Sequence, residues 1–322
     1  MKKTLTAYLD TYNIISQNQF GFQASKSTFD ALDTFSEFLY KNLDKGEKIL
    51  SIFIDFKKAF DTVPHSILLE KLEYYGIRGP ILNWFASYLT DRSQSTRYGD
   101  QVSNPAKISV GLPQGSVLGP LLFNIFINDL SNISEVMNLL KFCDDSTMYL
   151  KHKDINELIY IANCELHKLN DWVLANRLTI NTDKTVAMLF STRKITDIPL
   201  LFIRNNFTYD IIKRVEYTKF LGVYYDEQLR FKKHISFLCG KMSKLAGMFY
   251  SLRWILPRNI LRQVYNAHVN SLLNYNTPIW CCNYPNNLKP LIVLQKKILG
   301  NVTKSYFLAH TQLLFKLSKY CD

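Results

Sequence analysis

Two short apolar segments, far apart in the chain, each place aspartate at the end of a predicted strand. Residues 49–56 are apolar and β-branched, which predicts a buried strand with Asp55 at its end. Residues 139–150 predict a strand, a tight turn and a second strand, with Asp144 and Asp145 at the tip. A sheet can bring such strands side by side, so we expect the three carboxylates to cluster. Clustered carboxylates need a neutralising cation, and Mg²⁺ prefers hard oxygen ligands of this kind.

Such a cluster suits phosphoryl transfer. Two Mg²⁺ ions about 3.5–4 Å apart activate an attacking hydroxyl and stabilise a leaving oxygen. Structural roles compete with this interpretation, because Asp-Asp is also an ordinary turn dipeptide and Asp55 could cap a strand end. Asp61 is a rival ligand, and we expect it to cap the helix that begins at Pro64.

The remaining pattern predicts a mixed α/β body followed by a helical, basic unit. Helices are predicted over residues 28–43, 64–76, 81–89 and 155–175, and strands over 185–190 and 220–225. After Phe231, apolar residues recur every three or four positions until Pro257, which indicates a long amphipathic helix. Three tryptophans are expected in the core: Trp172, Trp254 and Trp280.

The charge balance favours a polyanionic partner. The net charge is +12 and the pI is about 9.3, and Lys and Arg neutralise phosphates; an anionic membrane surface would also fit. The most apolar stretch, residues 117–130, contains proline and polar residues, so we expect no membrane span. The start of the chain does not resemble a signal peptide, and the six cysteines include no CxxC pair. We therefore expect an intracellular protein, nuclear or cytoplasmic and not secreted.

Six sequence blocks, in order, resemble the reverse transcriptases of non-LTR (LINE-type) retrotransposons, most nearly the jockey-like group. The blocks are QFGFQ at residues 19–23 with Ser27 and Thr28, FIDFKKAFDTVPH at 53–65, GLPQGSVLGPLLF at 111–123, FCDD at 142–145, NTDKT at 181–185 and FLGV at 220–223. Together they cover roughly residues 15–300.

This resemblance implies an α+β right-hand polymerase fold. Partial fingers would span residues 1–48, an antiparallel-sheet palm with the nucleotide site 49–229, and a helical thumb with a C-terminal extension 230–322. The implied reaction is RNA-directed DNA synthesis by two-metal nucleotidyl transfer, with an RNA template, a DNA primer and deoxynucleoside triphosphates as partners.

The resemblance also assigns roles to single residues. Asp55, Asp144 and Asp145 would be catalytic and would hold two Mg²⁺ ions. The nucleotide site would contain Phe56 through its carbonyl, Phe60 as a gate against the 2′-hydroxyl, Gln114, Gly115 and Lys184. Nucleic acid would be contacted by the primer-grip turn at Leu221 and Gly222 and by Lys241 and Lys244. A core aromatic is the alternative for Phe60, and an ordinary exposed lysine for Lys184.

Two departures from the family pattern support rival hypotheses. Met1 falls shortly before Gln19, so an upstream fingers segment is expected to be missing, and Gln23 stands where the family usually has Arg. Both departures favour a catalytically inactive, truncated nucleic-acid-binding remnant as the alternative function. A group II intron maturase is a further alternative, which the 53–65 block and the Phe142-Cys143 form disfavour. An unrelated basic scaffold is the last alternative.

Overall fold

The structure, a computed structural model, describes residues 1–193, 195, 198–205, 208–281 and 285–305. The chain divides into two compact units, Met1–Val215 and Glu216–Asp322. Helices and sheets are mixed, in agreement with the predicted α+β class. In the described part of the chain, no helix is long and apolar enough to cross a membrane. The assignment to fingers, palm and thumb stays a prediction.

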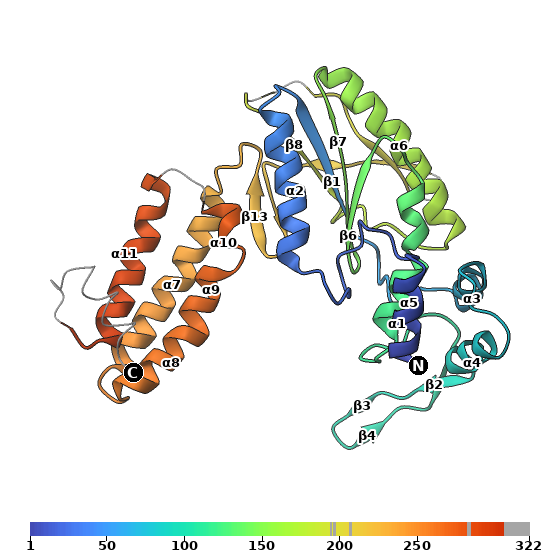
Figure 1. Ribbon diagram of the computed structural model, residues 1–322, viewed down its shortest axis with the longest axis horizontal. Coiled ribbons are helices and arrows are strands. Elements are labelled where there is room, and N and C mark those ends of the chain that lie inside the picture. The colour runs from blue at the N-terminus through green and yellow to red at the C-terminus, as the bar shows by residue number, and fades with distance from the viewer. Residues whose placement is uncertain (194, 196–197, 206–207, 282–284, 306–322) are drawn as a thin grey trace. The chain divides into compact units, whose positions relative to one another are not determined.

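A five-stranded sheet forms the centre of the first unit (Figure 1). Its order is β11 (Lys213–Arg214), β8 (Val186–Phe190), β1 (Lys48–Ile54), β7 (Asp145–His152) and β6 (Asn138–Phe142). The pairs β1–β7, β1–β8 and β6–β7 are antiparallel, whereas β11 runs parallel to β8. The apolar β1 is therefore an inner strand with a partner on each side.

Helices cover both faces of this sheet. Successive side chains of a strand point to opposite faces. On one face lies α2 (Thr28–Leu43). The rings of its Phe35 and of Phe53 in β1 pack edge to face, with 6.2 Å between the ring centroids. On the other face, Ile52 joins the main core together with α6 (Ile155–Ala175). Because both faces are covered, β1 can be apolar almost throughout.

Both long helices of this unit occupy the predicted residues, and their first turns explain why. At the start of α2, Ser27 Oγ accepts a hydrogen bond from the Asp30 N–H, while the Asp30 carboxylate accepts one from the Ser27 N–H. At the start of α6, the Asp154 carboxylate accepts bonds from the N–H groups of Asn156 and Glu157. Caps of this kind can be recognised from sequence.

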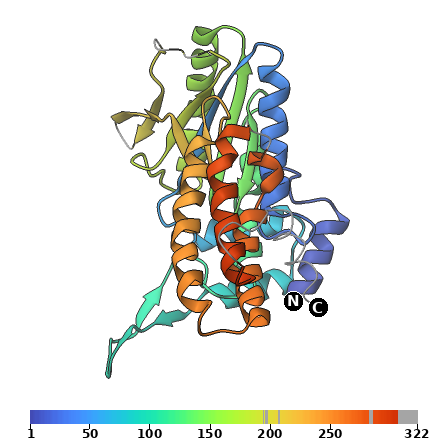
Figure 2. The ribbon, with the colours of Figure 1, turned by 90° about the vertical axis from the view of Figure 1, so that its left-hand side faces the viewer.

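Shorter elements complete the first unit. They are α1 (Lys2–Thr11), α3 (His65–Tyr74), α4 (Pro80–Leu89), β2 (Arg92–Gln94), β3 (Arg97–Tyr98), β4 (Gln101–Val102), β5 (Ala106–Ile108), α5 (Gly119–Phe126), the 3-10 helix η1 (Asn128–Asn132), β9 (Phe202–Asn205) and β10 (Thr208–Ile211). Strand β2 pairs with β5 and β3 with β4, which makes the long hairpin at the lower left of Figure 2.

The second unit is a hairpin followed by helices. Its elements are β12 (Tyr217–Phe220), β13 (Val223–Asp226), α7 (Lys232–Leu252), α8 (Arg258–Tyr265), the π-helical η2 (Asn266–Asn270), α9 (Ser271–Asn274), α10 (Thr277–Trp280) and α11 (Pro285–Val302). Helices α7 and α11 lie side by side (Figure 2). The bond from Arg253 Nη1 to Asn301 Oδ1, 3.1 Å long, joins the end of α7 to α11.

Two sequence-based predictions for this unit are wrong. The single strand predicted over residues 220–225 is instead a turn between two strands, because Leu221 and Gly222 have φ angles of +42° and +86°. Trp280 and Trp172 are buried, but Trp254 is 73% exposed. It follows the end of α7, where its ring lies 4.9 Å from the Arg253 guanidinium instead of in the core.

Candidate active site

The two parts of the predicted acidic cluster meet across β1 and β7. The antiparallel register pairs Ile54 with Ser146, so the next step along both strands sets Asp55 opposite Asp145. Asp144 lies in the turn that joins β6 to β7, directly before Asp145. Asp144 and Asp145 reach solvent, and Asp55 is half-buried. The sheet therefore brings together carboxylates that are 90 residues apart in the sequence.

Polar neighbours from a third segment hold Asp55. Asn181 Nδ2 donates to Asp55 Oδ2 at 2.8 Å, and the Asn181 N–H donates to the Asp55 carbonyl at 2.7 Å. The Asp55 N–H in turn donates to Thr185 Oγ1 at 3.2 Å. Both the backbone and the carboxylate of Asp55 are thus fixed by the 181–185 block. One carboxylate oxygen, Oδ1, is not used in these bonds.

The surroundings of Asp145 are unfavourable for a negative charge on its carboxylate. Partial burial and, to a smaller extent, the neighbouring Asp144 and Asp55 carboxylates together raise the pKa of Asp145 to about 6. Burial and the carboxylates of Asp144 and Asp145 also raise the pKa of the Cys143 thiol to about 12. A cation at this end of the sheet would relieve both effects.

The donor chemistry fits Mg²⁺, because carboxylate oxygens are its preferred protein ligands. The effect of Asp55 and Asp144 on the pKa of Asp145 shows that the three groups interact. In the described residues, however, no three His, Cys, Asp or Glu side chains are gathered closely enough to hold a metal ion. The structure thus supplies the ligand types at one place without a finished coordination shell.

The predicted nucleotide loop lies beside the segment that follows Asp55. The Leu112 N–H donates to the Phe60 carbonyl at 2.8 Å, and the Phe60 ring stacks on Phe123 at 4.2 Å between centroids. Phe60 is half-buried, so one part of its ring packs and another remains accessible. Gly115 has a φ of +74°, and a Cβ added to it would meet no atom within 4 Å. Its backbone angle, and not a lack of space, therefore favours glycine there.

Gln114 and Asp61 form a pair that the sequence did not predict. Gln114 Nε2 donates to Asp61 Oδ1 at 2.7 Å. The expected cap is wrong: the N-cap of α3 is Pro64, and no side chain caps this helix end. His65 Nε2 lies 2.7 Å from the Gly111 carbonyl. A cavity of about 570 Å³ is lined by Asp61, His65, Gly111 and Gln114, and also by Arg92.

Phe56 and Lys184 belong to the two segments whose backbone contacts fix Asp55. The Phe56 ring is buried, 6.5 Å from Trp172. Phe56 forms an antiparallel β-bridge with Ile180. The two hydrogen bonds of this bridge are made by the residues on either side of the pair, so the Phe56 carbonyl takes no part in them. Lys184 is exposed, and its N–H donates to the Asn181 carbonyl, so its backbone lies in the turn that positions Asp55.

Comparison with known families decides what kind of protein carries this arrangement. The sequence model of the family described as reverse transcriptase (RNA-dependent DNA polymerase) matches residues 1–225, which is more than half of the chain. The chain belongs to the reverse transcriptase family. The matched region includes all three aspartates, the 111–123 block and all but the last residue of the β12–β13 hairpin.

Curated relatives of this reverse transcriptase come from mobile elements. The chain is 27% identical, over 93% of its length, to a probable RNA-directed DNA polymerase from transposon BS of Drosophila melanogaster. It is 28% identical, over 90%, to the RNA-directed DNA polymerase from mobile element jockey of Drosophila funebris. These names confirm the resemblance to jockey-like elements. The chain spans about a third of the length of these relatives, 34% and 32%.

Among solved structures, a telomerase from Candida albicans in complex with a fragment of telomeric RNA is similar. It aligns with a TM-score of 0.49 and 13% identity, over 99% of this chain and 57% of the telomerase chain.

In the second unit of this reverse transcriptase, the predicted nucleic-acid contacts gather at one cavity of about 640 Å³. Gly222, Lys241 and Lys244 all line it. The hydroxyl of Tyr275 donates to the Leu221 carbonyl at 2.8 Å, and a Cβ on Gly222 would lie 2.8 Å from the Tyr275 ring. The turn and the basic face of α7 therefore belong to one surface.

Aromatic rings accompany the lysines of this cavity. Lys241 Nζ lies 4.6 Å from the centre of the Phe237 ring, and Lys219 Nζ lies 5.9 Å from it. His234 is buried beside Trp280, and burial lowers its pKa to about 4. His234 is thus a packing residue of this unit.

Proposed function

We propose that this reverse transcriptase copies RNA of a non-LTR retrotransposon into DNA. The observation that carries the proposal is that Asp55 lies opposite Asp145, whose neighbour in the chain is Asp144, in a chain of this family. The primer 3′-hydroxyl loses its proton and attacks the α-phosphate of a deoxynucleoside triphosphate. A new phosphodiester bond forms, the bond to the β-phosphate breaks, and pyrophosphate leaves.

Asp55, Asp144 and Asp145 would hold two Mg²⁺ ions, with the Phe56 carbonyl as a further ligand. When bound, these ions supply stabilisation of the negative charge on the transferred phosphoryl group. The part played by this chain's own residues is positioning. Asn181 orients one Asp55 oxygen through a 2.8 Å bond and leaves the other available for a ligand.

The substrates would be bound by residues in both units. Phe60 would close the space below the sugar, Gln114 and Gly115 would line the base and primer-template side, and Lys184 would reach the triphosphate. The turn at Leu221 and Gly222, with Lys241 and Lys244, would hold the primer-template backbone; lysines that contact phosphates position a duplex without reading its sequence. These roles correspond to partial fingers over residues 1–48, a palm over 49–229 and a thumb over 230–322.

Extension of a DNA primer on an RNA template tests the proposal. Residues 1–322 are assayed with and without Mg²⁺, with deoxy- and ribonucleotides offered separately. The double variant Asp144→Asn/Asp145→Asn removes two carboxylates, and Asp171→Asn, an exposed aspartate on α6, controls for a loss of charge. The proposal requires Mg²⁺-dependent extension with deoxynucleotides by the parent and the control, but not by the double variant.

A catalytically inactive nucleic-acid-binding remnant is the second candidate. The observation in its favour is that the described acidic side chains do not form a set that could hold a metal ion. Primer-template binding of equal strength in the parent and the double variant, with no extension by either, would support it.

A further inference from the structure

We propose that residues 18–21 form a brace that sets the position of the Asp144–Asp145 turn, with Gly21 as its positioning residue. The brace, as we call this segment, does not touch the carboxylates themselves. It acts through the strand and the turn that carry them. The inference rests on the proposed polymerase function, because it assigns the brace a task in holding the catalytic aspartates.

The backbone of the brace extends the edge of the central sheet. β6 is the edge strand next to β7. Its Lys141 N–H donates to the Asn18 carbonyl at 2.9 Å, and the Phe20 N–H donates to the Lys141 carbonyl at 2.8 Å, so Gln19 forms a parallel bridge with Lys141. The brace is thus bonded to β6 three residues before Asp144.

Two buried amides fasten the brace to α5. Gln19 and Asn124 are both fully buried. Gln19 Nε2 donates to Asn124 Oδ1 at 3.0 Å and to the Gly21 carbonyl at 3.2 Å, and Asn124 Nδ2 donates to the same carbonyl at 2.8 Å. Buried amides are costly to leave unpaired, so this geometry resists displacement. Since α5 follows the nucleotide loop directly, the brace connects that loop to the aspartate turn.

Gly21 lies directly against the turn. A Cβ at this position would be 2.3 Å from the Cys143 nitrogen and 2.7 Å from its Sγ, closer than atoms can approach. Cys143 itself has a φ of +60°, an angle that a residue with a side chain rarely adopts. Such a backbone persists only where its surroundings enforce it. Any side chain at position 21 would therefore displace the residue that precedes Asp144.

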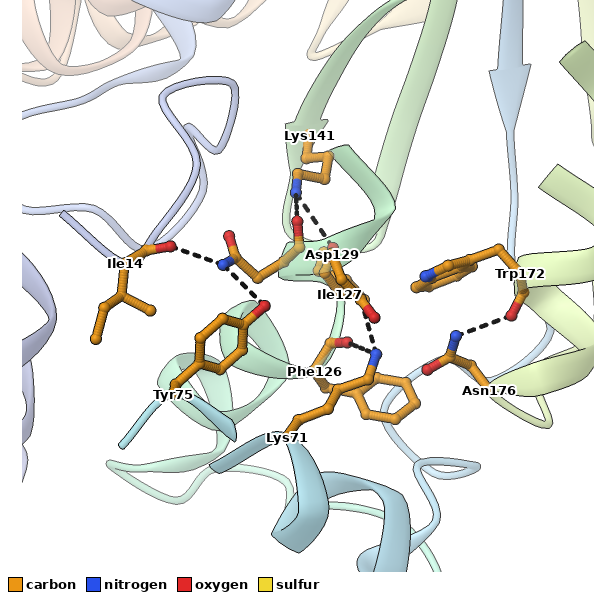
Figure 3. A network of polar contacts seen from close by, with 10 residues as sticks. Ile14, Lys71, Tyr75, Phe126, Ile127, Asp129, Lys141, Trp172 and Asn176 are labelled. Carbon is orange, nitrogen blue, oxygen red and sulfur yellow. Dashed lines mark hydrogen bonds and ion pairs between the residues drawn. The ribbon is translucent and has the colours of Figure 1, made fainter. Parts of the chain in front are cut away.

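A side chain of the same strand is anchored as well. The side chain of Lys141 is fully buried, and its Nζ donates to the carbonyls of Ile127 and Asn128 at 3.2 and 3.1 Å (Figure 3). These carbonyls lie at the end of α5, where a cation is favoured. β6 is therefore held by its backbone on the brace and by a side chain on the helix end, and the turn has little freedom to shift.

Gly21→Ala tests the brace, with Gly300→Ala as the matched control, because a Cβ on Gly300 would have no atom within 4 Å. Three quantities are measured: kcat for primer extension, the Kd for primer-template, and the rise in melting temperature caused by Mg²⁺. Gly21→Ala should lose about 100-fold in kcat with an unchanged Kd, since a misplacement of about 1 Å has that effect. It should also lose most of the Mg²⁺-induced rise, whereas Gly300→Ala should keep all three values.

Retention of the parental kcat and of the Mg²⁺-induced rise by Gly21→Ala would overturn the brace. If Gly21→Ala does not fold, Gln19→Met tests the brace instead. This variant keeps the side-chain volume but removes both hydrogen bonds of the Gln19 amide, and an unchanged kcat would contradict the proposal. If the parent extends no primer, the proposed polymerase function fails separately. The Mg²⁺-induced rise then decides alone, and its absence in the parent, or its survival in Gly21→Ala, would count against the brace.

Discussion

Asp55 and Asp145 lie opposite each other, one residue beyond the pair of Ile54 and Ser146 that ends the β1–β7 register. Partial burial of Asp145, together with the nearby Asp144 and Asp55 carboxylates, raises the pKa of Asp145 to about 6. The folded chain thus keeps Asp145 beside other carboxylates although the ionisation of Asp145 is unfavourable. Ionisation of Asp145 lowers the stability of the folded chain, and such a cost is typical of functional sites, including sites that bind a cation.

Asp145→Asn should raise the thermal stability of the protein at neutral pH. The pKa of Asp145 is higher in the folded chain, about 6, than its ordinary value of 3.8. The folded state therefore binds the proton more tightly, and ionisation costs stability as the pH rises between these two values. In EDTA, the variant should melt above the parent at about pH 8, and the difference should vanish at about pH 3. Circular dichroism melts across pH measure this, and a gap that is absent at every pH, or matched by Asp171→Asn, would contradict it.

Asn181→Leu should lower kcat by about tenfold without weakening primer-template binding. Asn181 donates a 2.8 Å hydrogen bond to the Asp55 carboxylate. Bonds to charged groups are worth about 1.5–3 kcal/mol, and about 1.4 kcal/mol corresponds to tenfold in rate. Single-turnover extension and a binding titration separate the two quantities. Asn156→Leu, at an exposed position of α6, is the control, and equal kcat values for the two variants would contradict the orienting role.

Phe60→Val should increase the use of ribonucleotides relative to deoxynucleotides. The Phe60 ring stacks on Phe123 but stays half-exposed, so part of it can meet a sugar. The measurement is the ratio of kcat/KM for the two nucleotide types. If that ratio is unchanged while the melting temperature falls, Phe60 is a core aromatic and not a gate; loss of an aromatic pair costs about 0.5–1.5 kcal/mol beyond the lost area.

Lys241→Gln/Lys244→Gln should weaken primer-template binding and make it less sensitive to salt. Both lysines are exposed and line the cavity that includes Gly222. Each lost phosphate contact lowers the slope of log K against log salt by about 0.9, so the double variant should lose about two. Lys289→Gln/Lys297→Gln on α11 removes the same charge from other exposed positions. Equal slopes for the two double variants would assign the effect to net charge alone.

Much of the fold could be predicted from the sequence, because the signals are local. Helices α2 and α6 carry strong apolar periodicity and capping residues, and both occupy the predicted residues. The positions of Asp55, Asp144 and Asp145 at strand ends followed from apolar runs that end in acidic residues. Their mutual approach required only that the two strands pair.

The parts that were missed depend on distant partners or unusual backbone angles. The apolar pattern predicts one strand in place of the β12–β13 hairpin, because a positive φ at Leu221 cannot be read from leucine. Only the family resemblance implies a turn there. Asn181 and Gln114 belong to sequence blocks that were recognised, but their bonds to Asp55 and Asp61 arise only in the folded chain. The signal for Asn181 is a polar residue four positions before the strand predicted over 185–190, and no local pattern points to Asp55 as its partner.

Single-turnover extension of a DNA primer on an RNA template by Asp55→Asn tests the central claim most directly. Asp55 comes from a different strand than Asp144 and Asp145, so only the paired sheet makes it part of their site. We predict Mg²⁺-dependent extension by the parent and by Asp171→Asn, and no detectable extension by Asp55→Asn at unchanged primer-template affinity. Extension by Asp55→Asn at the parental rate would contradict the account.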